Sequence, residues 1–174
     1  IPPKAVIAGL RAVGYSVPTA VADISDNSIS AKATKIQVYS DPLPSTKVPY
    51  FCILDNGCGM TYDELDNAML FGSDRSQKTD SDIELGRFGL GLKTASLSQC
   101  TRFTVATKKE GCFNAFAFDL ENVERTNKIQ LCKLNSDEID ALPCIDVLKT
   151  YESGTLVVWN NFDRIEVSTR NFED

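Results

Sequence analysis

The chain has 174 residues, the length of one domain, which argues against a two-domain enzyme with its site in an interdomain cleft. Its 43% hydrophobic and 24% charged residues are ordinary globular values and exclude a wholly disordered, collagen-like or coiled-coil chain. The net charge of −6 disfavours non-specific binding to nucleic acid, so composition does not indicate a nucleic-acid partner.

Targeting signals and cysteines limit the class further. No apolar run approaches the roughly 18 residues that a membrane span needs, so we expect a cytoplasmic protein with no membrane partner. The six cysteines form no Cys-x-x-Cys pair and the chain has no histidine, so a structural zinc site is not expected and free thiols are favoured over disulfides. The chain opens with Ile1-Pro2-Pro3 and no Met, and we expect residues 1–174 to be one domain from the N-terminal part of a longer protein.

The predicted elements begin with a short helix over residues 4–13 and a longer one from Pro18 to about Ala31. Two leading helices, followed by strands that pair mostly as neighbours, favour an α+β two-layer sandwich over a doubly wound parallel sheet. The remaining elements are strands over 34–40 and 50–54, a helix over 61–70, a polar loop over 72–82, a helix over 92–98, and strands over 101–108, 112–119 and 155–159. Weaker signals indicate a strand near 128–133 and a helix near 136–142.

The helix after Pro18 carries the first candidate site. Asp23 and Asn27 stand four residues apart and share one flank, whereas Asp26 points to the opposite side. A carboxylate beside a neutral amide oxygen can orient a water and ligate a hard cation. The alternative is two polar residues on a half-exposed helix.

The second candidate is Asp55-Asn56-Gly57-Cys58-Gly59-Met60, at the end of the apolar strand 50–54. Turn formers explain the glycines, but they do not explain a carboxylate directly after four apolar residues. An acid at the mouth of a core is costly unless a group donates to it. The exocyclic amine of adenine is such a donor, and the two glycines would let a flat ring approach the backbone.

Two further motifs follow. Gly86, Gly89 and Gly91 precede a predicted helix, an arrangement that favours a phosphate cradle. A P-loop is rejected, because Leu92 separates Gly91 from Lys93 and a polar loop, not a buried strand, comes before Gly86. The fourth motif, Gly154-Thr155, opens a strand.

In this order and at these separations, the four motifs resemble the GHKL ATPase superfamily: DNA gyrase ATPase subunits, ninety-kilodalton heat-shock chaperones, MutL, MORC proteins and histidine kinases. Residues 22–31 are similar to its N-box, and the other three to its Asp-x-Gly-x-Gly, Gly-x-x-Gly-x-Gly and Gly-Thr motifs. The style is closest to MORC-like and MutL-like members. The resemblance implies a Bergerat fold, in which a mixed, mostly antiparallel sheet carries helices on one face and ATP lies under a lid, here residues 72–85.

The resemblance also implies roles for single residues. Asp23 would be the catalytic base, Asn27 the Mg²⁺ ligand and Asp55 the acceptor of the adenine amine, while Lys93 would approach a phosphate or be a solvated helix lysine. The residues expected to bind ATP are Asn27, Asp55, Gly57, Gly59, Met60, Gly86, Arg87, Phe88, Gly89, Leu90, Gly91, Lys93 and Thr155.

One departure from the family pattern leaves the function open. Hydrolytic members usually have Glu where this chain has Asp23, whose side chain is a methylene shorter. We therefore expect a Mg²⁺-dependent domain that binds ATP and ADP, hydrolyses ATP slowly and drives a conformational change or homodimerisation of the full-length protein. The alternatives are a nucleotide-sensing module with little hydrolysis, or a kinase catalytic domain.

Overall fold

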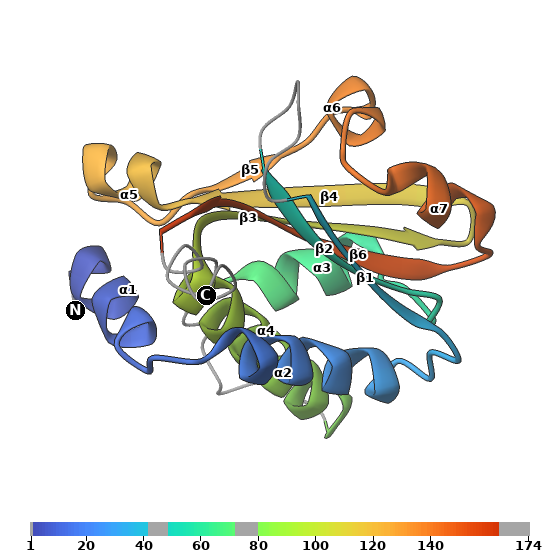
Figure 1. The fold of residues 1–174 in the computed structure, drawn as a ribbon, viewed down its shortest axis with the longest axis horizontal. Coiled ribbons are helices and arrows are strands. Elements are labelled where there is room, and N and C mark those ends of the chain that lie inside the picture. The colour runs from blue at the N-terminus through green and yellow to red at the C-terminus, as the bar shows by residue number, and fades with distance from the viewer. Residues whose placement is uncertain (1, 42–48, 72–79, 164–174) are drawn as a thin grey trace, which may run out of the picture.

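One antiparallel sheet forms the centre of the molecule (Figure 1). The computed structural model describes residues 2–41, 49–71 and 80–163, with the backbone alone for residues 80–89. The sheet order is β1-β2-β6-β3-β4-β5, so the last of the described strands lies between β2 and β3. The strands are β1 (Ile36–Asp41), β2 (Tyr50–Asp55), β3 (Cys100–Lys109), β4 (Cys112–Asp119), β5 (Leu131–Lys133) and β6 (Gly154–Phe162).

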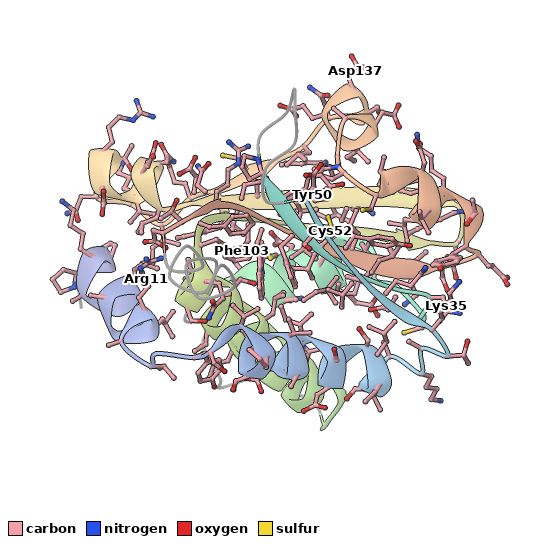
Figure 2. All side chains as sticks on the ribbon, in the orientation of Figure 1. Arg11, Lys35, Tyr50, Cys52, Phe103 and Asp137 are labelled. Carbon is pink, nitrogen blue, oxygen red and sulfur yellow. The ribbon has the colours of Figure 1, made fainter. Side chains whose placement is uncertain are left out.

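Helices cover both faces of this sheet. The main core lies between the sheet and the first five helices, and Figure 2 shows Phe103 in this layer. A second, smaller core lies on the opposite face, under α6 and α7. The expected α+β sandwich is confirmed, and α6 and α7 are an addition to it. The helices are α1 (Pro3–Arg11), α2 (Val17–Ser30), α3 (Tyr62–Met69), α4 (Asp80–Gln99), α5 (Leu120–Thr126), α6 (Ser136–Asp140) and α7 (Ile145–Thr150).

The apolar run of β2 follows from these two cores. Ile53 points into the main core, whereas Cys52 and Leu54 point into the second one. A strand covered on both faces reads as continuously hydrophobic instead of alternating. The strand prediction for Tyr50–Leu54 is confirmed, and the strand extends one residue further, to Asp55.

Local capping sets the starts of the two helices that flank the site. The hydroxyl of Ser16 accepts from the backbone N–H of Thr19, and Pro18 stands in the first turn of α2. Thr61 caps α3 in a capping box with Glu64, whose carboxylate accepts from the Thr61 N–H at 2.7 Å. Both predicted helix starts are confirmed to within a residue.

The helix α4 differs from expectation. It begins at Asp80, so residues 80–91, expected as a loop and a glycine turn, have helical backbone. Residues 72–79 of the expected lid lie outside the described residues.

Two short helices, α5 and α7, were not predicted. Each spans fewer than two full turns, too short for a hydrophobic repeat to show in the sequence. All six cysteines are free thiols. Within the described ranges, the structure contains no helix with both the length and the apolar character needed to cross a lipid bilayer.

Candidate functional site

Asp55, the last residue of β2, is the centre of the candidate site. Its side chain is 6% exposed and accepts three hydrogen bonds, from the Ser28 hydroxyl at 2.6 Å, the Gly57 N–H at 2.8 Å and the Thr155 N–H at 3.2 Å. Burial raises the pKa of Asp55 above its ordinary value, and the three hydrogen bonds offset part of that rise. An ionised carboxylate accepts about four hydrogen bonds, so one acceptor position of Asp55 is left for a further donor.

The glycines of the following loop are required by close contacts within the protein. Gly59 has a φ of +64°, and a Cβ there would stand 2.1 Å from the backbone oxygen of Lys108. A Cβ on Gly57 would stand 2.8 Å from the Cβ of Ala31. We expected these glycines to make room for a ligand ring, and the structure gives a reason inside the protein: the loop packs directly on β3 and on the end of α2.

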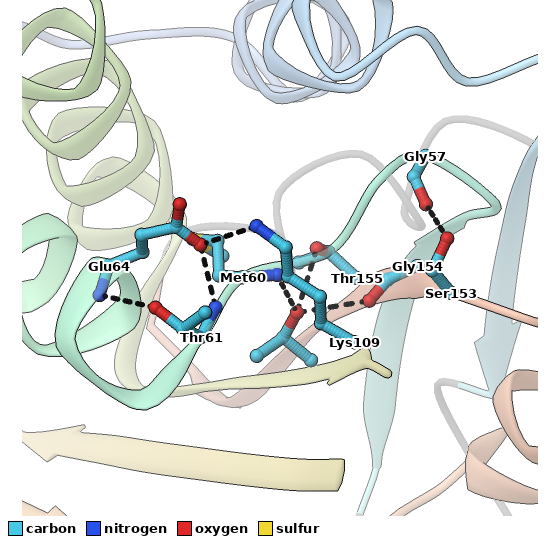
Figure 3. Close-up of polar contacts among 9 residues, drawn as sticks. Gly57, Met60, Thr61, Glu64, Lys109, Ser153, Gly154 and Thr155 are labelled. Atoms are coloured by element: carbon cyan, nitrogen blue, oxygen red, sulfur yellow. Dashed lines mark hydrogen bonds and ion pairs between the residues drawn. The ribbon is translucent and has the colours of Figure 1, made fainter. Parts of the chain in front are cut away.

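Hydrogen bonds hold the same loop on three sides. The Cys58 N–H donates to the oxygen of Ala31 at 3.0 Å, which ties the loop to the end of α2. The Ser153 hydroxyl donates to the Gly57 oxygen at 2.6 Å, just before β6 begins (Figure 3). On β3, the hydroxyl of Thr107 accepts from the Met60 N–H at 2.8 Å.

Thr107 is a residue that the sequence analysis missed. It is fully buried. The signal available in the sequence is a hydroxyl directly after residues 103–106, which are apolar except for Thr104. That signal is weak, because threonine is common in strands for its β-propensity alone.

The helix α2 places the first motif as predicted. Asp23 and Asn27 are half-buried and Asp26 is exposed, so the assignment of the two faces is confirmed. The Asn27 Nδ2 atom is buried with no hydrogen-bond partner among the described residues. Buried polar groups in native proteins are nearly always paired, so this amide nitrogen is left for an acceptor outside the described residues.

Asp23 has a neighbour that the sequence analysis did not foresee. The hydroxyl of Tyr15 lies close enough to interact with its carboxylate, and this interaction together with the carboxylate charge raises the pKa of Tyr15. The aspartate therefore already has a polar group of its own chain beside it.

The third motif lies in a different setting from the one expected. Amides inside a helix donate to carbonyls four residues earlier, so residues 86–89, inside α4, are not in the open turn expected before a helix. That turn is wrong for this structure, and the role of Gly86, Arg87, Phe88 and Gly89 in phosphate binding stays a prediction. Leu90 is exposed.

Lys93, on the same helix, is not a solvated lysine. It is 6% exposed, its ammonium donates to the oxygen of Leu70, and it lies 4.9 Å from the centroid of the Phe71 ring. These contacts join α4 to the end of α3.

The fold thus brings three of the four motifs together around one carboxylate. Ser28, next to Asn27, reaches Asp55 from α2, and Thr155 reaches it from β6. A backbone donor from residue 155 meets an acceptor a hundred positions earlier in the chain. The arrangement forms a buried acceptor site beside an unpaired amide.

Comparison with known proteins gives a family match and several relatives. The family model described as "Histidine kinase-, DNA gyrase B-, and HSP90-like ATPase" matches residues 15–155. The chain is 35% identical over 92 residues to "ATPase MORC2B" of Mus musculus, 32% over 92 residues to "ATPase MORC2" of Homo sapiens, and 36% over 93 residues to human "MORC family CW-type zinc finger protein 1". Each alignment covers 52% of this chain and 9% of the relative, so the matched region spans about a tenth of the length of these proteins.

Proposed function

The chain belongs to the histidine kinase-, DNA gyrase B- and HSP90-like ATPase family, and on that premise we propose that it binds ATP with Mg²⁺ and hydrolyses it slowly. Relatives named as ATPases support the nucleotide. We further propose that ATP binding drives a conformational change or dimerisation of a longer protein.

The observation that carries the proposal is the remaining acceptor position of buried Asp55. The exocyclic amine of adenine is a donor and matches it. Guanine has a carbonyl oxygen at the same place on its ring, which would face the carboxylate and leave both acceptors unpaired. Sites built to hydrogen-bond one group discriminate strongly against an analogue that lacks it, because buried polar groups then lose their partners.

The residues near Asn27 fit a hard cation. Its amide and the Asp23 carboxylate offer oxygen atoms, which are the donors that Mg²⁺ takes. Among the described residues no cluster of three or more His, Cys, Asp or Glu is placed to hold a metal ion, so we expect the nucleotide phosphates and water to supply most ligands. When bound, Mg²⁺ would neutralise phosphate charge, and Asn27 would hold it through the amide oxygen.

A nucleotide-sensing module with little hydrolysis is the second candidate. It is favoured by the surroundings of Asp23, the proposed base, whose short side chain already interacts with the Tyr15 hydroxyl. To act as a general base, the Asp23 carboxylate must accept a hydrogen bond from a water molecule, either in addition to its interaction with Tyr15 or in place of it.

Two measurements separate these candidates. Calorimetry with ATP, ADP and GTP, each with and without Mg²⁺, is expected to show Mg²⁺-dependent binding and a preference for adenine. Asp55→Asn is expected to weaken ATP binding by about 1 to 3 kcal/mol, and exposed Asp26→Asn serves as the control. A steady-state ATPase assay on the full-length protein distinguishes hydrolysis from sensing. Equal affinity for ATP and GTP would contradict the assignment of Asp55.

A further inference from the structure

A buried hydroxyl outside all four motifs connects two of them. Thr107 lies on β3 directly opposite Thr155 on β6 in the sheet register. Its Oγ1 atom contacts three polar groups: the Met60 N–H at 2.8 Å, the Gly154 oxygen at 3.1 Å and the Thr155 hydroxyl at 3.5 Å. One side chain therefore joins the end of the Asp55 loop to the start of β6.

The directions of these hydrogen bonds follow from counting protons. A hydroxyl has one proton and two lone pairs. The Met60 N–H can only donate to Thr107, and the Gly154 carbonyl can only accept from it, so the single proton of Thr107 goes to Gly154. In any hydrogen bond between the two threonine hydroxyls, whose oxygen atoms lie 3.5 Å apart, Thr155 must then be the donor.

This fixes what Thr155 presents on its other side. With its proton directed to Thr107, the Thr155 hydroxyl offers only lone pairs to a ligand. Asp55, which accepts from the backbone N–H of the same residue, also offers only an acceptor. At these two residues the proposed site then offers acceptors only, which suits a ligand group with two N–H protons and opposes a carbonyl oxygen.

We infer that Thr107 is a positioning residue that sets base selectivity at the proposed nucleotide site, by holding the Thr155 hydroxyl as an acceptor. The inference rests on the proposed function and extends it: an exocyclic amine is accepted and a carbonyl at the same ring position is rejected. Without the Thr107 hydroxyl, Thr155 is free to turn its proton toward the ligand and donate to a carbonyl.

The test compares two nucleotides that differ at this position. Inosine triphosphate carries a carbonyl oxygen where ATP carries the amine, so the ratio of their dissociation constants reports selectivity. Thr107→Val removes the hydroxyl at nearly constant volume and is expected to lower the preference for ATP about tenfold. Thr107→Ser, which keeps the hydroxyl, is expected to restore the wild-type ratio. Thr104→Val, at another buried threonine of β3, is the matched control and should leave the ratio unchanged.

The outcomes are distinguishable. If wild type binds neither nucleotide, the proposed function fails. If wild type prefers ATP and Thr107→Val keeps the same ratio, or if Thr107→Ser behaves like Thr107→Val, the inference about Thr107 is overturned. Thermal melts check that each variant folds. Should Thr107→Val not fold, Thr107→Ala decides, because it also removes the hydroxyl and must then lower the preference for ATP, and an unchanged ratio would refute the inference.

Discussion

Replacing Gly59 with alanine tests how closely the Asp55 loop is packed on β3. The structure predicts two separate costs at this position. Its φ of +64° lies in the left-handed region that L side chains avoid, and the added Cβ would stand 2.1 Å from the backbone oxygen of Lys108. A backbone atom in a sheet cannot rotate out of the way as a side chain tip can, so the loop or the strand must shift.

Two other glycines allow each cost to be measured alone. Gly111 has a φ of +76° and open space where a Cβ would be added. Gly111→Ala should therefore lower the free energy of unfolding by about 1 kcal/mol, through the backbone conformation only. A Cβ on Gly154 would stand 2.1 Å from the oxygen of Asp55, and since its φ is not left-handed, Gly154→Ala should lose about 1 to 3 kcal/mol for the overlap only. Gly59→Ala should show both, about 2 to 4 kcal/mol.

Urea unfolding followed by circular dichroism gives the free energy of unfolding of the three variants and the wild type. The expected order of destabilisation is Gly59→Ala largest and Gly111→Ala smallest. If Gly59→Ala loses no more stability than Gly111→Ala, the close packing of the loop on β3 is refuted. Nucleotide affinity, measured in parallel, should fall for Gly59→Ala and stay unchanged for Gly111→Ala, which lies in the turn between β3 and β4.

Three further predictions concern the acids and thiols. Asp23→Asn should lower ATP turnover of the full-length protein about 10²- to 10⁴-fold with affinity within a few-fold, and exposed Asp26→Asn should change neither; a steady-state assay that finds the reverse would show that the wrong acid was chosen. Because burial raises the pKa of Asp55, the stability linked to its neutral form is lost as pH rises through the folded-state pKa. Asp55→Asn is neutral at every pH, so it should not lose this stability and should be at least as stable as wild type at neutral pH. A difference in stability between variant and wild type that stays the same at every pH in thermal melts would contradict this prediction. Exposed Cys58 should react with a disulfide reagent in the folded protein, whereas buried Cys100, whose pKa burial raises, should react only on unfolding.

Much of this protein was readable from sequence because it depends on local patterns. Ser16 and Pro18 mark the start of α2, Thr61 marks the start of α3, and helical periodicity separates exposed Asp26 from half-buried Asp23 and Asn27. Each of these rests on residues within one or two turns of each other, where capping and side-chain spacing are decisive. The order of the four motifs also identified the family, which the family match over residues 15–155 confirmed.

Only the tertiary structure decided which residues meet. No local pattern indicates that β6 inserts between β2 and β3, yet that pairing places Thr155 beside Asp55 and opposite Thr107. Lys93 reads as a surface lysine until α4 packs on α3 and buries it against Leu70. Strand order and helix packing depend on contacts between segments far apart in the chain. These contacts are stabilised by the burial of whole faces of helices and sheet, and a short stretch of sequence does not specify them.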